Sequence, residues 1–334
     1  MNIEQRVHVL TQLQTRLQKY PISLNKAILK AHIENQWFST DTIKQSLDAI
    51  CTHFLAKEKL ETWMARYDFV EPAVPKKVGL VMAGNIPLVG FHDFLCVFMS
   101  GHYAQIKLSN KDKRLFTAIA GMLIDIAPEM AKYIEMVPIL KNFDAVIATG
   151  SNNTGRYFES YFGKYPNIIR KNRSSIAILN GKETAEDLIE LGKDVFQYYG
   201  MGCRNVSKLM IPRDFDLVFL LDQWETYKEL MHHNKYKNNY DYQRAILLIN
   251  KVKHLASDHV MILEEQKIAA PISIVYYEYY DDEDALNNLL VEKHKQIQCV
   301  VGQGEDYIPF GKAQSPQLWD YADKMDTMQF LLSL

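Results

Sequence analysis

Residues 78–108, VGLVMAGNIPLVGFHDFLCVFMSGHYAQIKL, decide the fold. The apolar run at 78–82 is typical of a buried strand, residues 87–99 have a helical pattern that ends at Ser100-Gly101, and residues 103–108 resemble a second strand. A strand, a helix and a strand at this spacing predict a right-handed parallel βαβ unit. We therefore expect a fold of the α/β class.

The same alternation continues along the chain and indicates two α/β domains. Thr184 is followed three residues later by Asp187, which is the pattern of a capping box at a helix start. We expect further helices over 114–126 and from residues 156 and 184, and further strands over 144–148, 175–179, 206–211 and 271–276.

The beginning of the chain has a helical pattern instead. Apolar residues recur at helical spacing over 7–17 and stop before Pro21, and a second run over 43–55 follows the N-cap candidate Ser39. We expect these stripes to be packing faces. The proline-bracketed segment 71–75, EPAVP, predicts a connection into the α/β part of the chain.

Composition excludes several classes of protein. With 334 residues, 48% hydrophobic and 23% charged, the chain is globular and long enough for two domains. Its 38 Lys and Arg against 40 Asp and Glu give no basic field for nucleic acid. Four cysteines are too few for a disulfide scaffold and favour a protein of the reducing cytosol. The chain has no CxxC or HExxH motif, so we expect no metal site. The N-terminus has charges within its apolar pattern and no run approaches a spanning helix, so we expect a cytoplasmic protein without an integral membrane segment.

Two loops at predicted strand ends have the chemistry of anion sites. In Gly84-Asn85-Ile86-Pro87, the Asn85 amide is suited to a developing oxyanion, and the plain alternative is a turn with a helix cap. The loop 150–155, GSNNTG, is small and polar and opens a helix, which suits a pyrophosphate, although it is neither GxGxxG nor a P-loop.

A third loop holds the candidate nucleophile. Cys203 lies in the turn Gly200-Met-Gly-Cys-Arg204, where glycines leave a thiol accessible and the neighbouring Arg204 favours the thiolate. Cys51, Cys96 and Cys299 lie in apolar or helical patterns, so we expect them to be buried.

A fourth segment is basic. Residues 107–114 follow the second predicted strand, where open α/β sheets bind ligands, and the plain alternative is a solvated face.

In this order, the segments resemble the aldehyde dehydrogenase superfamily over residues 75–330, and within it the acyl-CoA reductase branch typified by the fatty-acid reductases of bacterial bioluminescence. The resemblance implies that Cys203 is the nucleophile and that the Asn85 amide, with the Cys203 N–H, holds the oxyanion. By the same resemblance, the cofactor-binding residues are Lys107, Asn110, Gly150, Ser151, Glu265 and Phe310.

The resemblance also implies an architecture of two open Rossmann-like sheets. The expected segments are a helical region 1–70, a nicotinamide-cofactor domain 71–175, a catalytic domain 176–305 and a C-terminal tail 306–334. Within the tail, residues 327–332 are expected to form a strand at a dimer edge.

One departure from the superfamily pattern bears on the reaction. Hydrolytic members have a glutamate upstream of the nucleophile that activates water, whereas this chain has RKNRSS at 170–175. The resemblance therefore implies reduction of a fatty acyl-CoA to the aldehyde through an acyl-Cys203 thioester. NADPH is the expected cofactor because Asn110 carries no charge that would repel a 2′-phosphate, and NADH is the alternative. His92 is a candidate proton donor, with a packing role as its alternative.

Two other interpretations stay open at this point. One is an acyl-phosphate reductase of the glutamate semialdehyde type, and the other is a non-catalytic acyl- or nucleotide-binding subunit. The expected partners are the acyl-CoA substrate, a second copy of the chain, and acyl-activating or acyl-transferring enzymes.

Overall fold

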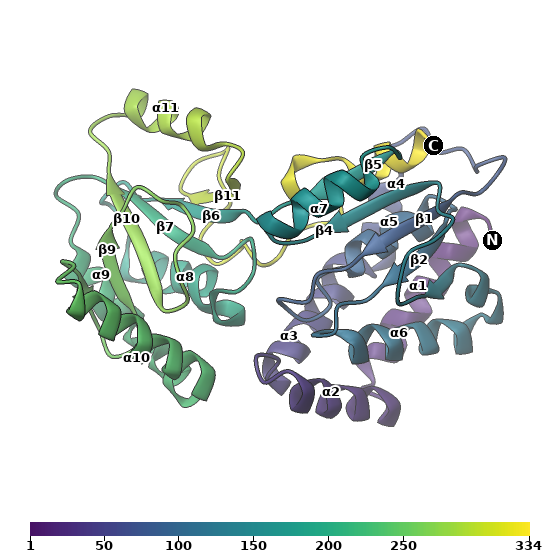
Figure 1. Cartoon of the computed structure of the whole chain (residues 1–334), viewed down its shortest axis with the longest axis horizontal. Helices are drawn as coiled ribbons and strands as arrows, with labels where there is room; N and C mark the ends of the chain where they lie inside the picture. The colour runs from purple at the N-terminus through teal and green to yellow at the C-terminus, as the bar shows by residue number, and fades with distance from the viewer. The chain divides into compact units, whose positions relative to one another are not determined.

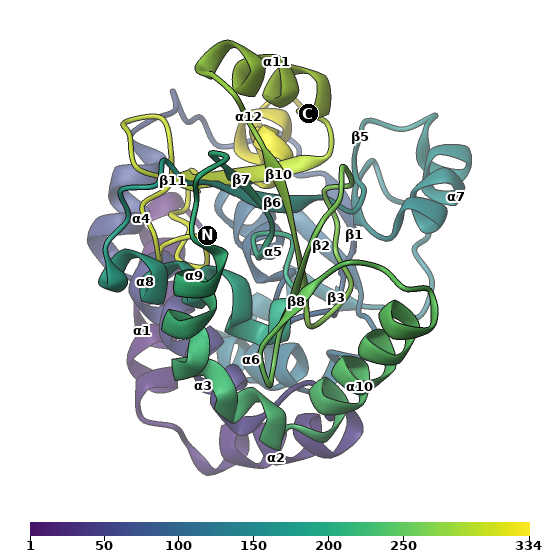
Figure 2. The same ribbon diagram turned by 90° about the vertical axis from the view of Figure 1, so that its left-hand side faces the viewer.

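The computed structural model describes the backbone of residues 1–334 and every side chain except that of Asn152. The chain forms two compact units, unit 1 (Met1–Asn172 and Pro316–Leu334) and unit 2 (Arg173–Ser315). Each unit has its own sheet, as Figures 1 and 2 show. The N-terminal helical region belongs to unit 1, because its helices bury their apolar faces in the same core as the first sheet.

The sheet of unit 1 is parallel and has the strand order β3-β2-β1-β4-β5. β1 pairs with β2 from Lys77 opposite Tyr103 to Val81 opposite Lys107, which confirms the predicted βαβ unit. The strands are β1 (Lys77–Val81), β2 (Tyr103–Lys107), β3 (Ile134–Met136), β4 (Ala145–Thr149) and β5 (Asn167–Arg170).

Right-handed crossovers place α5 (Phe91–Met99) and α6 (Lys113–Ile126) on one face of this sheet and α7 (Asn152–Phe162) on the other (Figure 1). The helix predicted to begin at Pro87 begins at Phe91 instead. Leu88 has a φ of 57° and donates its N–H to Asp112 Oδ2 at 2.6 Å, so the residues before Phe91 form turns.

Four helices precede the sheet: α1 (Ile3–Gln18), α2 (Ile22–Glu34), α3 (Thr40–Ala49), which continues as a π-helical turn (Ile50–Phe54), and α4 (Lys57–Met64). Ser39 accepts a hydrogen bond from the Thr42 N–H, which confirms the predicted N-cap. The sequence interpretation missed α2, where apolar residues also lie on the exposed side of the helix and obscure the amphipathic pattern; these are Ile22, Leu29 and Ile33.

The predicted C-terminal strand is wrong. Residues Thr327–Leu332 form helix α12, capped by the Asp326 carboxylate, which accepts the Gln329 N–H. Met328 and Leu331 are buried against the core of unit 1, and a strand would turn alternate residues away from it. The first part of the predicted tail, up to Ser315, belongs to unit 2.

The sheet of unit 2 has the order β11-β6-β7-β10-β9-β8, and only β8 is antiparallel to its neighbour. β10 begins at Ile274 and not at Pro271, because Ser273 has a φ of 67° and the Ile274 N–H closes a turn onto the Pro271 carbonyl. The strands are β6 (Ser174–Ile178), β7 (Val206–Ile211), β8 (Leu255–Ala256), β9 (Met261–Glu264), β10 (Ile274–Tyr279) and β11 (Ile297–Gly302).

Helices cover both faces of this sheet. Alternate residues of β6 point to different cores, with Ala177 packed in the core of α8 and α9, and Ile176 and Ile178 in the core of α11. The helices are α8 (Ala185–Phe196), with the predicted Thr184 capping box, α9 (Leu217–Trp224), α10 (Asn234–Ile249) and α11 (Glu283–Lys293). Short 3₁₀ segments lie at Pro128–Lys132, Gln197–Gly200, Glu225–His232 and Ala322–Lys324.

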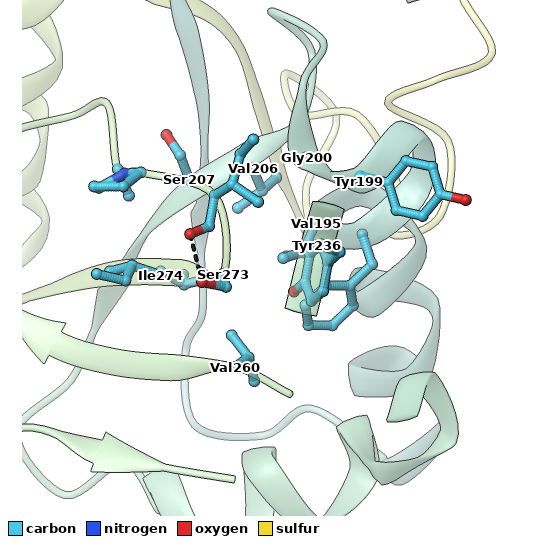
Figure 3. Close-up of a pocket in the computed structure, with 14 residues that line it drawn as sticks. Val195, Tyr199, Gly200, Val206, Ser207, Tyr236, Val260, Ser273 and Ile274 are labelled. Carbon is cyan, nitrogen blue, oxygen red and sulfur yellow. Dashed lines mark hydrogen bonds between the residues drawn. The ribbon is translucent and has the colours of Figure 1, made fainter. Parts of the chain in front are cut away.

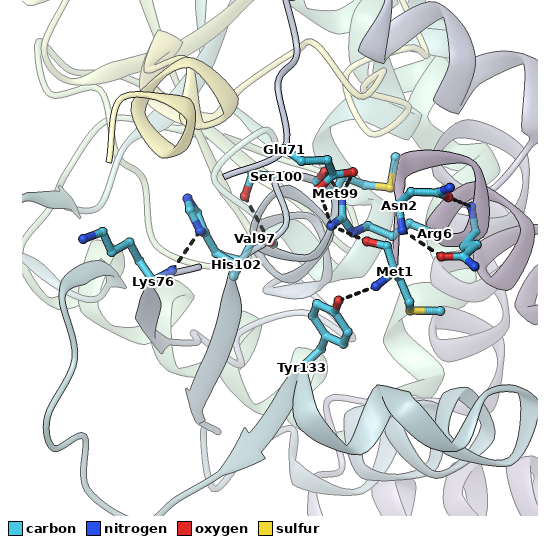
Figure 4. Close-up of polar contacts among 11 residues, drawn as sticks. Met1, Asn2, Arg6, Glu71, Lys76, Val97, Met99, Ser100, His102 and Tyr133 are labelled. Carbon is cyan, nitrogen blue, oxygen red and sulfur yellow. Dashed lines mark hydrogen bonds and ion pairs between the residues drawn. The ribbon is translucent and has the colours of Figure 1, made fainter. Parts of the chain in front are cut away.

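A buried arginine joins α1 to the sheet domain of unit 1 (Figure 4). Arg6 is 2% exposed and donates to both carboxylate oxygens of Glu71, at 3.1 and 2.8 Å. It also donates to the Met1 carbonyl at 2.7 Å and to the Met99 carbonyl at 3.3 Å. This guanidinium therefore holds together the chain start, the linker and the end of α5.

We expect Glu71→Ala to lower the free energy of unfolding of unit 1 by ~3–5 kcal/mol, because it leaves the buried Arg6 charge without its partner. Arg6→Met should cost less, ~1–3 kcal/mol, because the half-exposed Glu71 can be hydrated. Urea unfolding measures both. The control is Arg16→Met, which breaks an exposed pair with Asp125 and should cost at most ~1 kcal/mol. Equal losses in all three variants would contradict this assignment.

Candidate active site

Three loops meet at the carboxyl edge of the unit 1 sheet. The strand order changes direction between β1 and β4, and ligands of open α/β sheets bind at such a point. Asn85 follows β1, Lys107 ends β2 with Asn110 just beyond it, and Gly150-Ser151 follows β4. The structure thus places five of the predicted site residues along one edge of unit 1. Lys107, Asn110 and Ser151 are exposed there.

A buried carboxylate that the sequence interpretation did not single out joins two of these loops. Asp112 is 6% exposed, and its Oδ2 accepts the Leu88 N–H from the loop that carries Asn85. Its Oδ1 is buried with no hydrogen-bond partner among the described residues. Burial raises the pKa of Asp112 to about 7, and the Leu88 N–H opposes that rise. The sequence did not indicate this role because Asp112 lies within the charged segment 107–114, where a solvent-exposed carboxylate is expected.

The β1 and β2 loops also touch at a glycine. A Cβ on Gly84 would lie 2.6 Å from Ser109 Oγ, closer than side chains pack, so only glycine allows this approach. Arg114 is directed elsewhere, because its guanidinium makes a two-pronged pair with Glu34 of α2 at 2.6–2.9 Å. At the start of α7, the Ser151 hydroxyl accepts the Thr154 N–H as an N-cap.

Cys203 lies in unit 2, in a turn just before the amino end of β7. Three consecutive residues ahead of it have left-handed backbones: Tyr198 (φ 53°), Tyr199 (φ 58°) and Gly200 (φ 74°). Two of these are not glycine, and such strained residues cluster at functional sites. The Cys203 side chain is partly exposed.

Asn205 holds this turn to the end of α8. Its Oδ1 accepts the Gly202 N–H at 2.8 Å, and its Nδ2 lies within 3.1 Å of three carbonyl oxygens at the end of the helix, those of Asp194, Val195 and Gln197. The residue is 2% exposed. The sequence interpretation missed it, because an asparagine two residues after a cysteine has no distinguishing pattern.

Ser175 supports the turn from the neighbouring strand β6. Its hydroxyl donates to the Cys203 carbonyl oxygen at 3.0 Å and lies 3.0 Å from Cys299 Sγ. Because Ser175 is fully buried, these contacts are shielded from water. The carbonyl side of the Cys203 peptide is therefore held in place.

The four thiols differ in accessibility. Cys51 and Cys96 are buried, as predicted, whereas Cys299 is only partly buried and the prediction for it is wrong. Its position in the bulged strand β11 leaves its side chain beside Ser175. Burial raises the pKa of Cys51 to about 12 and that of Cys96 well above its usual value, so neither is a ready thiolate.

The segment that contains Phe310 is attached to the same region of unit 2. The Asp194 carboxylate of α8 accepts the N–H groups of Gly311 at 2.6 Å and Ala313 at 2.8 Å. The Arg204 guanidinium donates to the Ala313 carbonyl, next to the nucleophile turn. Burial raises the pKa of Asp194 to about 6 against the effect of these two N–H groups. The structure therefore brings the Phe310 segment to the Cys203 turn.

Glu265 lies farther along the sheet. It follows the carboxyl end of β9, where Glu264 is level with Tyr277 of β10 and Leu209 of β7. Cys203 precedes the amino end of β7, so the structure does not bring these two predicted residues together at one edge. The buried Lys208 holds this loop through the Glu265 carbonyl oxygen at 2.9 Å.

A small pocket, partly open to solvent, lies at the amino ends of β7 and β10 (Figure 3). Polar and apolar atoms share its lining about equally, and the residues around it include Tyr199, Gly200, Val206, Ser207, Tyr236 and Ser273. Because Tyr199 and Gly200 are part of the chain that leads into Cys203, the pocket adjoins the nucleophile turn.

His92 is not placed as a proton donor. Its Nε2 lies 2.9 Å from the Leu318 carbonyl oxygen, and the rings of Phe54, Trp63 and Tyr321 surround it at 5.2–6.0 Å. Burial lowers its pKa, which keeps the imidazole neutral. The packing role is therefore the one that the structure favours.

Solved structures with the same arrangement of strands and helices are aldehyde dehydrogenases. A putative aldehyde dehydrogenase from Burkholderia cenocepacia aligns with a TM-score of 0.67, at 12% identity over 92% of this chain and 75% of its own. The indole-3-acetaldehyde dehydrogenase of P. syringae, solved with NAD+, gives 0.68 at 12% identity over 91% and 72%. This chain has the aldehyde dehydrogenase fold. The fold predicted from the motif order is thus confirmed.

The chain also has a relative in sequence. The long-chain acyl-protein thioester reductase 2 of Photobacterium leiognathi is 22% identical over 243 residues, which are 66% of this chain. The alignment spans 50% of that relative, so the chain corresponds to about half its length. No family model matches the chain. These similarities confirm the resemblance to the acyl-CoA reductase branch of the superfamily.

Two kinds of feature are absent from the residues that the structure describes. No helix among them is long and apolar enough to cross a membrane. Among the same residues, no group of three or more His, Cys, Asp or Glu side chains is arranged to hold a metal ion.

We expect Asn205→Ala to lower the free energy of unfolding of unit 2 by ~1–3 kcal/mol, because it leaves the Gly202 N–H and helix-end carbonyls buried without partners. Asn205→Asp should cost at least as much, since a carboxylate would face those carbonyls. Denaturant unfolding measures both. In the control, Asn180→Ala, an exposed asparagine is lost and the change should be smaller. If Asn205→Ala matches that control, Asn205 does not hold the turn.

Proposed function

We propose that the protein reduces a fatty acyl thioester, with acyl-CoA as the donor, to the aldehyde through an acyl-Cys203 intermediate. The observation that carries this proposal is the state of Cys203: a partly exposed thiol in a turn whose backbone is fixed by Asn205 and Ser175. The buried thiols of Cys51 and Cys96 have raised pKa values and are unsuited to the same task.

The first step is an exchange of thioesters. The Cys203 thiolate attacks the carbonyl carbon of the acyl-CoA, the bond from that carbon to the coenzyme sulfur breaks, and coenzyme A leaves as its thiolate. We also propose that the positive charge of Arg204, the next residue in the chain, favours the attacking thiolate. In this proposal, the Asn85 amide stabilises the oxyanion that forms during attack.

The sequence between β5 and β6 favours reduction over hydrolysis. Residues 170–175, RKNRSS, contain no carboxylate that could activate water against the acyl-enzyme. Arg170 is occupied by Asp93, at 2.7 Å from both carboxylate oxygens, and by the Thr327 hydroxyl at 2.7 Å. An acyl thioester on Cys203 is therefore expected to survive until it is reduced.

The carboxyl edge of unit 1 fits a nicotinamide dinucleotide. The change in strand order, the exposed Lys107 and the glycine loop before α7 are the features that such a cofactor uses. We propose that Lys107 and Asn110 hold its adenosine ribose and that Gly150-Ser151 holds its pyrophosphate. When bound, the reduced nicotinamide supplies the hydride for the acyl group.

The acyl donor and the partners are part of the proposal. The named relative acts on an acyl-protein thioester, and the exchange at Cys203 is chemically the same whether the leaving thiol belongs to coenzyme A or to a protein. The pocket beside the nucleophile turn is the proposed place for the acyl chain. A second copy of the chain and acyl-activating or acyl-transferring enzymes are the proposed protein partners.

We expect Cys203→Ala to abolish acylation of the protein by a saturated fatty acyl-CoA, because no other thiol occupies such a turn. Intact-mass spectrometry after mixing, together with a free-thiol assay, detects the adduct and the released coenzyme A. Cys51→Ala and Cys299→Ala are matched controls and should keep the adduct.

An adduct on Cys203→Ala would contradict the proposed nucleophile. An unmodified parent protein would instead favour a non-catalytic binding subunit. If an acyl phosphate acylates the parent and the acyl-CoA does not, the protein is an acyl-phosphate reductase.

We expect NADPH to bind about tenfold more tightly than NADH, since Lys107 can pair with a 2′-phosphate and Asn110 does not repel it. Fluorescence titration at one salt concentration measures both affinities. Asn110→Asp should weaken NADPH selectively, by roughly tenfold. The control is Asn142→Asp, the same change at an exposed position before β4, which should leave the ratio unchanged. Tighter binding of NADH by the parent protein would overturn the expected preference.

A further inference from the structure

The end of α10 and the strand β8 form an exposed apolar surface on unit 2. We define this α10–β8 surface by Tyr242, Leu248, Ile249, Val252 and Leu255. Ile249 is 79% exposed, Tyr242 is 62% exposed and Leu248 is 60% exposed. Large apolar side chains exposed in one group mark an interaction site more often than a solvated face.

A tight turn and a short segment connect the end of α10 to β8. α10 ends with a turn in which Lys251 has a φ of 52°, a conformation that glycine or asparagine usually takes at a helix end. The Lys251 N–H donates to the Leu248 carbonyl at 3.1 Å and the Val252 N–H to the Leu247 carbonyl at 2.9 Å. The chain then enters β8, a two-residue strand at the edge of the sheet.

Cations predominate around the end of α10 and β8, and the acidic residues of this segment, Asp241 and Asp258, flank it on either side. Residues 242–257, YQRAILLINKVKHLAS, include Arg244, Lys251 and Lys253 and no acidic residue. None of these three cations forms an ion pair with any described residue. Apolar side chains beside unpaired cations are the combination that binds to the interface of an anionic bilayer.

We propose that the α10–β8 surface binds reversibly to membranes that contain anionic phospholipid. Leu248 and Ile249 enter the boundary between headgroups and acyl chains, and Lys251, Lys253 and Arg244 contact the lipid phosphates. The last turn of α10 lies on the bilayer and does not cross it. This inference is independent of the reaction proposed at Cys203, because it depends only on the surface.

The test is co-sedimentation of the full chain with vesicles of phosphatidylcholine alone and of an equal mixture with phosphatidylglycerol. We expect binding to the mixed vesicles, little binding to phosphatidylcholine, and release at high salt. Lys251→Gln/Lys253→Gln should weaken binding ~25-fold, at about fivefold for each lost charge. Leu248→Ser/Ile249→Ser should weaken it roughly tenfold or more.

The control is Lys182→Gln/Lys295→Gln, which removes two exposed lysines of unit 2 that lie outside the α10–β8 surface. This control should bind the mixed vesicles like the parent. Circular dichroism and thermal unfolding check that every variant is folded.

Several results would overturn the proposal. Equal binding to both kinds of vesicle, or unchanged binding in the two α10 variants, would show that this surface does not recognise anionic lipid. A dimer in sedimentation that dissociates in Leu248→Ser/Ile249→Ser would assign the surface to a second copy of the chain. Failure of the parent to bind any vesicle, together with salt-sensitive binding of an acidic protein, would assign it to a protein partner.

Discussion

A parallel sheet has to be covered on both faces, and most of this structure follows from that constraint. Its strands are apolar on both sides, and crossover helices are the means by which a parallel sheet buries them. In unit 2, Ile176 and Ala177 are neighbours on one strand and belong to different cores. In unit 1, the N-terminal helices also pack in the core that covers the sheet. The loops at the ends of the strands are left uncovered, and they carry the candidate functional residues.

At these strand ends, buried polar side chains hold the loops that carry the functional groups. Asp112 joins the Asn85 loop to the basic segment, Asn205 attaches the Cys203 turn to α8, and Asp194 fixes the segment after Phe310. Each is nearly inaccessible to water, so each hydrogen bond is costly to break. A nucleophile set in a fixed backbone suits thioester exchange, since little reorganisation is needed when the acyl group arrives.

Thioester exchange and the handling of a long acyl chain require different surroundings. A thiol exchange needs a positioned sulfur and no water-activating carboxylate, which agrees with the RKNRSS segment ahead of β6. A long acyl chain and the corresponding aldehyde partition into apolar surroundings. A reductase bound to a lipid surface would therefore be close to both its substrate and its product. The α10–β8 surface is placed on unit 2, the unit that also contains Cys203.

The sequence by itself determined what depends on neighbours along the chain: most strands, the Thr184 and Ser39 caps, the glycine-lined turn of Cys203 and the order of motifs that indicates the aldehyde dehydrogenase fold. The tertiary structure decided what depends on distant partners. Residues 327–332 are apolar enough for a strand or a helix, and burial against unit 1 selects the helix. Pro87 does not start α5, because Asp112, twenty-four residues from Leu88, accepts its N–H. Ser175 has no distinguishing pattern in sequence, because its hydroxyl meets the Cys203 carbonyl only when β6 pairs with β7. Asn205 has none either, because its amide meets the carbonyls at the end of α8 only when the chain folds back into the Cys203 turn.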